Sequence, residues 1–484
     1  MKFTRKSFLK AGAAALAFPM IVPSGCVSRR GKPRFSPNEQ IEVGLIGLGR
    51  ISTTFEQKLL ANQANIRLAR IVGVCDLDTR RVAHSKGLVE NAYRKALGES
   101  IPVAGFQYVD EMLSSLPGID AVCVSVPDHA HCLAAVICAL AGKHIWMQKP
   151  FSQTVQEGRM LTNLIKQKGL TFQISSQQRS SPQFRNACAF VRNGRLGKIV
   201  RVEVGLGIDK EGGRTEKMPV PETFDYDAWL GATPEAYYTE DRCHTQNLSR
   251  IGSRPGWIQM APYGWGMITN WGAHHLDIVQ WGLGMEDSGP TACTGNCEWM
   301  KKGLWNVHTA YDLHYTYPGG IDVHVCNKFP NGVKFIGEKG DWIFVSRGAQ
   351  KVTASDPTQP GPVLKALDSN KPELLLPLRV DETPLHASPN NDHMLDWLTA
   401  VRTGGACVTN VESAFHSANV CTLGHLCMEM RRSGLGTTLG WDPGTEQTDN
   451  AEINKLLRCP ERNQYSIPRR LAAAGYNPAK LIHP

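Results

Sequence analysis

A short apolar run and a helical stretch meet at two closely spaced glycines in the segment Ile41-Glu42-Val43-Gly44-Leu45-Ile46-Gly47-Leu48-Gly49-Arg50-Ile51-Ser52. Gly47 permits a tight turn, and Gly49 lets the backbone approach a pyrophosphate at the N-terminus of the helix. Ser52 stands where the usual pattern has a third glycine. Such a loop predicts dinucleotide binding when strands and helices alternate around it.

Apolar runs and helical patterns do alternate downstream of this loop. Further apolar runs lie at Leu68 to Cys75, Ile119 to Val126, His144 to Met147 and Leu170 to Ile174, with helical patterns such as Asp78 to Leu97 and His131 to Ala141 between them. This alternation is typical of α/β proteins with a parallel, doubly wound sheet. We therefore predict a Rossmann domain over residues 38–176.

Asp76 ends the second apolar run, where an acidic side chain can accept hydrogen bonds from the ribose hydroxyls of adenosine. Its negative charge should repel a 2′-phosphate, which favours NAD as the cofactor over NADP. Arg80 and Arg81 follow closely and keep NADP as the less favoured alternative.

Motifs after the third and fourth apolar runs resemble a known signature. They read Pro127-Asp128-His129-Ala130-His131, then Ala141-Gly142-Lys143-His144, then Gln148-Lys149-Pro150. These motifs resemble the T-P-N-x-x-H, A-G-K-H-V and E-K-P signature of the Gfo/Idh/MocA oxidoreductases, the family of glucose–fructose oxidoreductase and inositol dehydrogenase. Val126, Asp128 and Gln148 replace the Thr, Asn and Glu of that signature.

A second element of the family, D-x-G-x-H-x-x-D, is similar to Asn270-Trp271-Gly272-Ala273-His274-His275-Leu276-Asp277, with Asn270 in place of the first Asp. On one helix, Asn270, His274 and Asp277 would share a face. The Q-K-P form and Gln177-Gln178-Arg179-Ser180 resemble the exported bacterial branch of the family. The resemblance covers the chain from about residue 41 to its end.

The resemblance implies that Lys149, His274 and Asn270 are the catalytic residues. Oxidation of an alcohol moves a hydride to nicotinamide and a proton to a base. The positive nicotinamide ring should lower the pKa of Lys149, and histidine titrates near neutrality. Asn270 cannot exchange a proton, so it would orient His274 or hold a substrate hydroxyl. The alternatives are a solvated Lys149, a core His274, and Asn270 as the N-cap of the following helix.

Two further sets of residues complete the expected site. The expected cofactor contacts are Gly47, Gly49, Arg50, Ile51, Asp76, Arg80, Ser125, Pro127, His131, Gln148, Lys149 and Gln177. The expected substrate contacts are Arg179, Arg254, Trp257, Trp271, His275 and Asp277. For His275 a structural role is the alternative, and for Asp277 the alternatives are a partner for His274 or a packing ion pair.

The pattern changes to a second domain, which we place at residues 177–484 and expect to be a family-type substrate and oligomerisation domain. Strands at Lys198 to Gly205 and between residues 311 and 345, with hairpin signals such as Asn331-Gly332, predict an α+β domain with a large, mainly antiparallel sheet. The aromatic insert Asp209 to Tyr263 would line a carbohydrate cleft or, alternatively, pack as a loop that stabilises the sheet or forms a dimer contact.

The first 34 residues resemble an export signal and linker. They carry eight basic residues and no acidic one, and Thr4-Arg5-Lys6-Ser7-Phe8-Leu9-Lys10 resembles a twin-arginine signal with Lys6 in place of the second Arg. We expect a periplasmic or cell-envelope protein, and Cys26 is a candidate site of lipid attachment. Without this segment the net charge of +9 falls to about +1, which argues against nucleic-acid binding.

Fourteen cysteines form no framework with metal-ligand spacing, so we predict no metal site. A disulfide between Cys293 and Cys297 stays open. The sequence thus predicts an exported, NAD-dependent oxidoreductase that binds a carbohydrate or polyol and forms a dimer or tetramer, as family members do. The alternatives are an NAD-dependent glycosidase that uses transient oxidation and elimination, and a non-catalytic sugar-binding relative.

Overall fold

The computed structural model describes residues 40–60, 67–348 and 364–482. The predicted export signal, its basic residues and Cys26 lie outside these residues. Within the described parts of the chain, every helix falls short of the length and apolarity needed to cross a bilayer.

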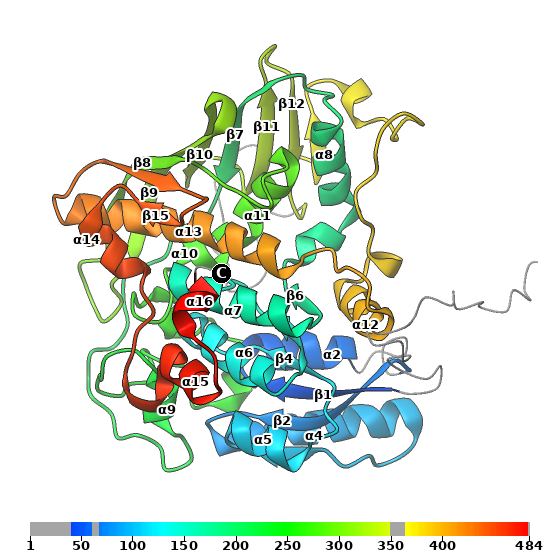
Figure 1. The fold of residues 1–484 in the computed structure, drawn as a ribbon, viewed down its shortest axis with the longest axis vertical. Helices are drawn as coiled ribbons and strands as arrows, with labels where there is room; N and C mark the ends of the chain where they lie inside the picture. Colours follow the sequence, from blue (N-terminus) through cyan, green and yellow to red (C-terminus); the bar gives the residue numbers. More distant parts are fainter. Residues whose placement is uncertain (1–39, 61–66, 349–363, 483–484) are drawn as a thin grey trace, which may run out of the picture.

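The first domain is built on a six-stranded parallel sheet of order β3-β2-β1-β4-β5-β6, in the lower half of Figure 1. Its strands are β1 (Ile41–Ile46), β2 (Ala69–Cys75), β3 (Ala104–Phe106), β4 (Ala121–Val124), β5 (His144–Met147) and β6 (Phe172–Ile174). Its helices are η1 (Ser52–Glu56), α2 (Gln57–Leu60), α4 (Thr79–Leu97), α5 (Val109–Ser115), α6 (His131–Leu140) and α7 (Val155–Lys168). The predicted Rossmann topology is confirmed, while β3, which has only three residues and a central glycine, gave too short a signal to predict.

The second domain carries a nine-stranded sheet of order β13-β12-β11-β7-β10-β9-β8-β14-β15. Its strands are β7 (Ile199–Gly205), β8 (Ala292–Trp299), β9 (His308–Tyr317), β10 (Ile321–Cys326), β11 (Gly332–Gly337), β12 (Trp342–Val345), β13 (Leu367–Ser369), β14 (Thr438–Asp442) and β15 (Gln447–Thr448). Only β7 and β10 pair in parallel within it, so the predicted mainly antiparallel sheet is confirmed.

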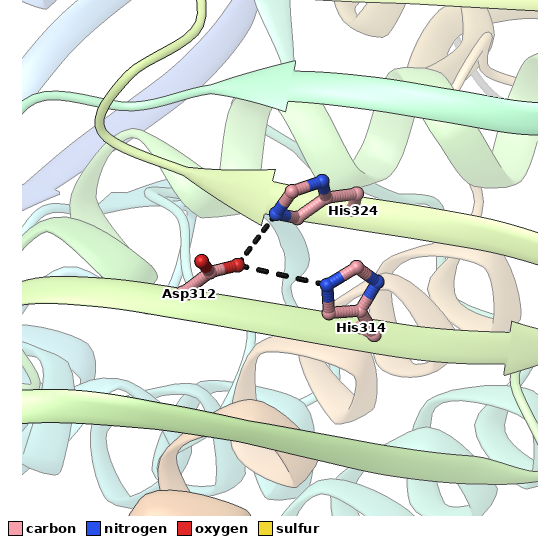
Figure 2. Close-up of side chains that lie close together, drawn as sticks. All are labelled: Asp312, His314 and His324. Atoms are coloured by element: carbon pink, nitrogen blue, oxygen red, sulfur yellow. Dashed lines mark hydrogen bonds and ion pairs between the residues drawn. The ribbon is translucent and has the colours of Figure 1, made fainter.

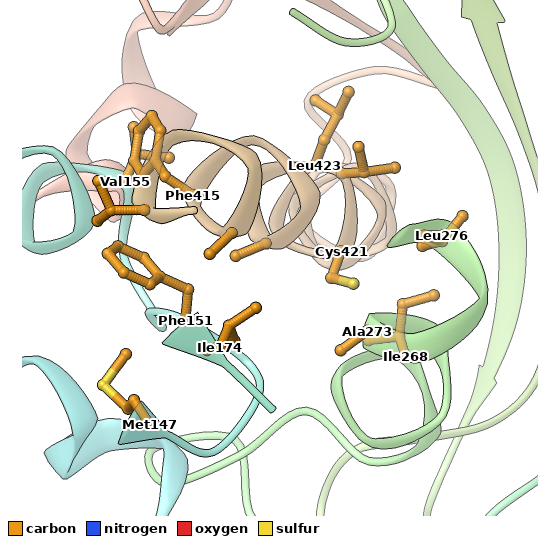
Figure 3. Close-up of a cluster of buried hydrophobic side chains, with 14 of the residues drawn as sticks. Met147, Phe151, Val155, Ile174, Ile268, Ala273, Leu276, Phe415, Cys421 and Leu423 are labelled. Carbon is orange, nitrogen blue, oxygen red and sulfur yellow. The ribbon is translucent and has the colours of Figure 1, made fainter. Parts of the chain in front are cut away.

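Helices cover one face of this sheet. They are α8 (Pro182–Arg192), α10 (Met267–Asn270), α11 (Gly272–Leu283) and α13 (Val411–Arg432). Helix α13 runs between the two domains, and Phe415 packs edge-to-face on Phe151 of the Rossmann domain with ring centres 6.3 Å apart. Further along the same helix, Cys421 lies among side chains of the second domain such as Ile268 and Leu276 (Figure 3). The two domains therefore share one continuous hydrophobic core.

The C-terminal part of the chain returns to the first domain. Helix α12 (His393–Thr403) places Trp397 against Trp146 of β5, with ring centres 5.9 Å apart. Helices α15 (Ile467–Ala473) and α16 (Pro478–Ile482) contact α6 and α7. Segments assigned by sequence to the second domain thus also cover the Rossmann sheet.

Cys293 and Cys297 both lie in β8, where a separation of four residues corresponds to about 13 Å along an extended strand. That distance is too long for a disulfide, and both thiols are free.

Candidate active site

A cavity of about 930 Å³ opens at the carboxyl edge of the Rossmann sheet. Its wall combines the loops after β1, β2, β4 and β5 with residues of the 209–263 insert, α10 and α11. Ligands of open α/β sheets bind at this edge, where the strand order reverses between β1 and β4. The volume suits a dinucleotide with a small second ligand.

The glycine loop leaves room for a ligand at one end of this cavity. Gly47 has a φ of +82°, and a Cβ there would lie 2.6 Å from the carbonyl oxygen of Ser125, so only glycine fits. At Gly49 the space is open: the nearest atom to a Cβ would be Nη1 of Arg81, at 3.9 Å. Gly49, Arg50 and Ile51 all face the cavity at the start of the helical segment. This cradle fits the pyrophosphate of NAD.

Replacing Gly49 by alanine should therefore weaken NAD binding at least tenfold without loss of stability. The added methyl group meets no protein atom closer than 3.9 Å, but it occupies the space into which a pyrophosphate would fit. Isothermal titration with NAD and thermal unfolding measure the two effects. Gly87→Ala, which also introduces a methyl group into open space but lies on α4, is the control. Unchanged NAD affinity in Gly49→Ala would contradict the assignment.

The acidic side chain after β2 fastens the glycine loop. Asp76 accepts hydrogen bonds from the backbone N–H of Leu48 at 2.7 Å and of Asp78 at 2.9 Å. Burial raises the pKa of Asp76, while the nearby Arg81 lowers it. The carboxyl group still lines the cavity, as a ribose-binding acid should.

Arg80, an expected cofactor contact, is replaced in the cavity wall by its neighbour Arg81. The side chain of Arg81 is 4% exposed and donates to the carbonyl of Thr245 in the insert. The side chain of Arg80 is 41% exposed, and it contacts Asp78 and Gln246 away from the cavity. Asp78 is the N-cap of α4, so Arg80 and Arg81 both lie in its first turn. Consecutive side chains of a helix point about 100° apart, and only one of the two can therefore face the cavity.

A buried carboxyl group ties the ends of β4 and β5 together. Glu56 accepts hydrogen bonds from Nε1 of Trp146 at 2.8 Å, from Nε2 of Gln148 at 2.9 Å and from the hydroxyl of Ser125. Burial raises its pKa. An amide at position 148 can donate to Glu56, whereas a glutamate would place a second carboxylate against it. This explains why Gln148 stands where the family signature has glutamate.

Lys149 and Asp128 both line the cavity, and each acts on the pKa of the other. Its Nζ donates to the backbone carbonyl of Asn270 at 2.8 Å. Burial lowers the pKa of Lys149 to about 8, against the opposing effect of Asp128, and Arg50, Arg254 and Arg347 lower it further. Burial raises the pKa of Asp128 to about 7, opposed by Lys149 and a hydrogen bond to Thr269. Both groups therefore titrate close to neutral pH, as acid–base groups of an active site commonly do.

The remaining expected cofactor contacts also line the cavity; they are Ser125, Pro127, His131, Gln148 and Gln177. His131 is held by Nδ1, which donates to the carbonyl of Pro150 at 2.8 Å. Burial lowers the pKa of His131 to about 3, so the ring is neutral. Its Nε2 is buried and has no partner within the described residues.

The motif from residue 270 to residue 277 does not form one helix. Helix α10 ends at Asn270, and α11 begins at Gly272 with Trp271 as its N-cap. Asn270 is therefore not the cap of the following helix. Asn270 and His274 line the cavity, as predicted, but Asp277 does not. Burial lowers the pKa of His274 well below its usual value, with Arg347 and Lys149 adding to the effect, so its ring is neutral.

Three expected substrate contacts lie away from the cavity, which corrects the sequence-based assignment. Arg179 is fully buried and donates to both oxygens of Asp277, at 2.7 and 2.8 Å, and to Glu286 at 2.5 Å. His275 is held by the side chain of Asn331, 2.6 Å from its Nε2. These side chains join α11 to its surroundings and are absent from the cavity wall.

The insert supplies the other expected substrate contacts. Arg254 and Trp257 line the cavity, as does Trp271 at the join of α10 and α11. Arg254 pairs with the buried Asp209 at 2.5 Å, and Asp209 also accepts from the backbone N–H of Met267 at the start of α10. Many aromatic rings of the insert form a small core of their own; its members are Phe224, Tyr226, Trp229, Leu230, Tyr238, Cys243, Met260 and Tyr263. The insert thus serves both as cavity wall and as a packed structural loop.

Among the residues of the cavity wall that were not assigned to the site from the sequence, Asp128 and Arg347 act on the pKa of Lys149. The signal for Asp128 was its departure from the family signature, which has asparagine at this position. Arg347 gave no signal, since it follows β12 at the start of a Pro- and Leu-rich stretch. In the structure its guanidinium lies 4.7 Å from the ring centre of Trp271, close enough to act on the pKa values of Lys149 and His274.

Comparisons with known proteins agree with this geometry. The chain is 26% identical over 221 residues to a glycosyl hydrolase family 109 protein of Shewanella amazonensis, covering 41% of this chain and 45% of that protein. It is 24% identical over 161 residues to scyllo-inositol 2-dehydrogenase (NAD(+)) of Bacillus subtilis, covering 33% of this chain and 43% of that protein. The matched segments span less than half of either relative.

A solved structure shares the fold over most of the chain. The WlbA dehydrogenase of Bordetella pertussis, in complex with NADH and UDP-GlcNAcA, superposes with a TM-score of 0.56 and 16% identity, covering 84% of this chain and 99% of that one. Family models match two regions: an oxidoreductase family, NAD-binding Rossmann fold, over residues 41–176, and an oxidoreductase family, C-terminal alpha/beta domain, over residues 207–467. With both domains matched and the glycine loop, Asp76 and Lys149 in place around one cavity, the chain belongs to the Gfo/Idh/MocA family of NAD-binding oxidoreductases.

Proposed function

We propose that this protein is an NAD(H)-dependent oxidoreductase that transfers a hydride between its cofactor and a hydroxyl or keto group of a sugar or polyol. The observation that carries the proposal is the buried Lys149, which lines one cavity together with Asp128, the cofactor loop and the side chains of Arg254, Trp257 and Trp271. Indole rings suit the C–H faces of a sugar, and guanidinium groups can donate to its hydroxyls. The named activities of the dehydrogenase relatives support this substrate class.

The proton transfer falls to Lys149. Bound NAD⁺ supplies the hydride acceptor for the substrate C–H bond. The neutral amine of Lys149 accepts the hydroxyl proton as the C=O bond forms, and the ammonium group returns it in the reverse direction. Its pKa of about 8 is matched to this task at neutral pH.

His274 serves as a neutral hydrogen-bonding partner in this scheme. Its pKa is held well below the usual value by burial and by Arg347 and Lys149, so it is a weaker base than Lys149. The ring lines the cavity, where it can hydrogen-bond to a substrate hydroxyl. We therefore assign the proton transfer, which the sequence divided between the two residues, mainly to Lys149.

Asp128 should set the pH at which the enzyme works. Oxidation requires neutral Lys149, so kcat/KM for oxidation should rise with pH through about 8 and then level off. The carboxylate of Asp128 raises the pKa of Lys149. Asp128→Asn removes this attraction, so the rising limb should move to lower pH by about one unit. If the rise of kcat/KM in Asp128→Asn occurs at the same pH as in the wild type or at higher pH, Asp128 does not raise the pKa of Lys149.

The test of the function is a spectroscopic screen of the full-length protein. Reduced-nicotinamide absorbance and fluorescence are recorded with NAD present, before and after addition of individual glycosides, free sugars and polyols. We expect one compound class to reduce the cofactor. Cofactor that is bound but reduced by none of them would favour the non-catalytic alternative, and failure to bind NAD would overturn the proposal.

A glycosidase is the second candidate, favoured by the similarity to the family 109 glycosyl hydrolase. In that chemistry a transient keto group acidifies the neighbouring C–H bond, which permits elimination of the aglycone. An aryl glycoside separates the two functions. Release of free phenol without net accumulation of reduced cofactor indicates a glycosidase, whereas reduced cofactor with the glycosidic bond intact indicates a dehydrogenase.

We also propose that the protein is exported with its cofactor already bound. The insert covers the cofactor end of the cavity: the N–H of Thr79 donates to the carbonyl of Thr223 at 2.9 Å, and Arg81 donates to Thr245 at 2.9 Å. A covered site would retain NAD where no nicotinamide pool exists. Cell fractionation of the native chain and of a variant with lysine in place of Arg5 tests export. If the native chain and the variant are recovered in equal amounts from the cytoplasm, the result would argue against export through a twin-arginine signal.

The expected dimer or tetramer stays a proposal. One face of the nine-stranded sheet is free of helices within the described residues, and it offers a surface for a second copy. Size-exclusion chromatography with light scattering tests it, and a monomer at micromolar concentration would argue against it.

A further inference from the structure

Three metal-binding side chains meet on the helix-free face of the nine-stranded sheet. Asp312 and His314 stand two residues apart on β9, and His324 lies directly across from His314 on β10. Because side chains alternate along a strand, all three project to the face opposite α11 and α13. Figure 2 shows the two imidazole rings and the carboxylate grouped around one point. This cluster is separate from the NAD cavity.

The donor atoms are close enough to share one ion. Nε2 of His324 lies 2.5 Å and Nε2 of His314 lies 3.6 Å from the same oxygen of Asp312. The two rings stack with centres 4.0 Å apart and planes inclined by 19°. One ligand atom from each residue falls within 4.8 Å of the others. Two imidazole nitrogens and a carboxylate oxygen are a ligand set that suits Zn²⁺.

A second carboxylate orients one of the ligands. Oδ1 of Asp322 lies 2.9 Å from Nδ1 of His314, and a carboxylate can only accept. The neutral ring therefore carries its proton on Nδ1 and turns the lone pair of Nε2 toward Asp312. Two lone-pair donors then face each other at 3.6 Å, which is an arrangement that a cation between them would stabilise. Histidine ligands of zinc are commonly held by a carboxylate in this way.

We propose that Asp312, His314 and His324 bind a divalent transition-metal ion, for which Zn²⁺ is the best match. Three protein ligands leave at least one coordination position for water or for a group from a binding partner. In the single chain the side chains of Asp312 and His314 are 51% and 40% exposed, so the ion can enter from solvent before a second copy covers this face. The sequence gave no metal-ligand spacing because the ligands are brought together by strand register.

Arg201 opposes metal binding, and this sharpens the test. Its guanidinium donates to Nδ1 of His324 at 2.9 Å, which places the ring proton on Nε2, where it is shared with Asp312. For Nε2 to bind a metal, the ring proton must move to Nδ1, so Arg201 must turn away, toward Glu203 at 3.4 Å. Arg201→Gln offers an oxygen that accepts from Nδ1. We expect this variant to bind Zn²⁺ more tightly than the wild type.

The experiment is titration of Zn²⁺ into the full-length protein at pH 7.5, followed by calorimetry and by metal analysis after dialysis. We expect one site, weakened at least tenfold by His314→Gln or His324→Gln and 10- to 100-fold by Asp322→Asn. His386→Gln is the matched control, since His386 is an exposed histidine that pairs with Asp396 at 2.8 Å outside the cluster. It should leave the affinity unchanged.

Three outcomes would overturn the proposal. The first is a wild-type protein that binds no more Zn²⁺ than the His314→Gln/His324→Gln double variant. The second is an Arg201→Gln variant with weaker affinity than the wild type. The third is a thiolate charge-transfer band after replacement of Zn²⁺ by Co²⁺, which would assign the ion to cysteines. Thermal unfolding gives an independent readout, because Zn²⁺ should raise the Tm of the wild type but not that of the double variant.

Discussion

Replacing Lys149 by methionine is expected to lower kcat by 10²- to 10⁴-fold, the usual contribution of a general acid–base group. Methionine keeps most of the length of the side chain but cannot accept a proton. The fold should survive, because the neighbouring Asp128 already has a raised pKa and can become neutral once the ammonium group is gone. The measurement is cofactor reduction with the substrate found in the screen, together with the Kd for NAD.

Lys143→Met is the matched control for this variant. Lys143 precedes β5 at its amino end and donates to the carbonyls of Pro117 and Ile119, far from the carboxyl edge where the cavity lies. We expect its kcat to equal that of the wild type. Lys149→Met with wild-type turnover would remove Lys149 from the reaction, and loss of NAD binding in place of turnover would assign it to the cofactor alone.

Replacing Arg179 by methionine is expected to cost about 3–5 kcal/mol of unfolding free energy. The guanidinium is fully buried, its fork meets both oxygens of Asp277, and its removal leaves that carboxylate buried without a charged partner. Ser417 would remain as a neutral donor, at 2.8 Å. Chemical denaturation with urea measures the effect.

Two comparisons decide what Arg179 does. Arg192 pairs with Glu286, which Arg179 also contacts, but its side chain is 37% exposed, so Arg192→Met should cost at most about 1 kcal/mol. The double variant Arg179→Met/Asp277→Leu should be more stable than Arg179→Met, because it removes the uncompensated charge. If Arg179→Met keeps wild-type stability but raises KM for substrate, the original assignment as a substrate contact would be restored.

Most of the Rossmann domain could be predicted because its signals are local. Gly47 needs a positive φ, Asp76 follows β2, and the Gln148-Lys149-Pro150 motif follows β5. Each of these positions is fixed by the backbone of its own strand and turn. The predicted cofactor residues accordingly line the cavity, with Arg80 as the exception, since a shift of one position at a helix start changes the direction of the side chain.

The substrate-binding part of the cavity was less predictable because its residues come from segments that are far apart in the sequence. A helical pattern placed Asp277 near His274 on one helix face, but the buried Arg179 holds Asp277 in an ion pair outside the cavity wall. Strand β8 was missed because Gly295 and Asn296 interrupt its pattern. Arg347 reaches the cavity only because β12 ends beside Trp271.

The sequence by itself determined the fold class, the cofactor loop and the lysine that we assign to proton transfer, because backbone conformation and strand ends are encoded by neighbouring residues. The tertiary structure decided which charges meet. It brought Asp128 close enough to Lys149 to act on its pKa, removed Arg179 and Asp277 from the cavity, and brought His314 and His324 together across two strands. Such pairings depend on burial and register between segments far apart in the chain, and these are set only when the two domains pack around a common core.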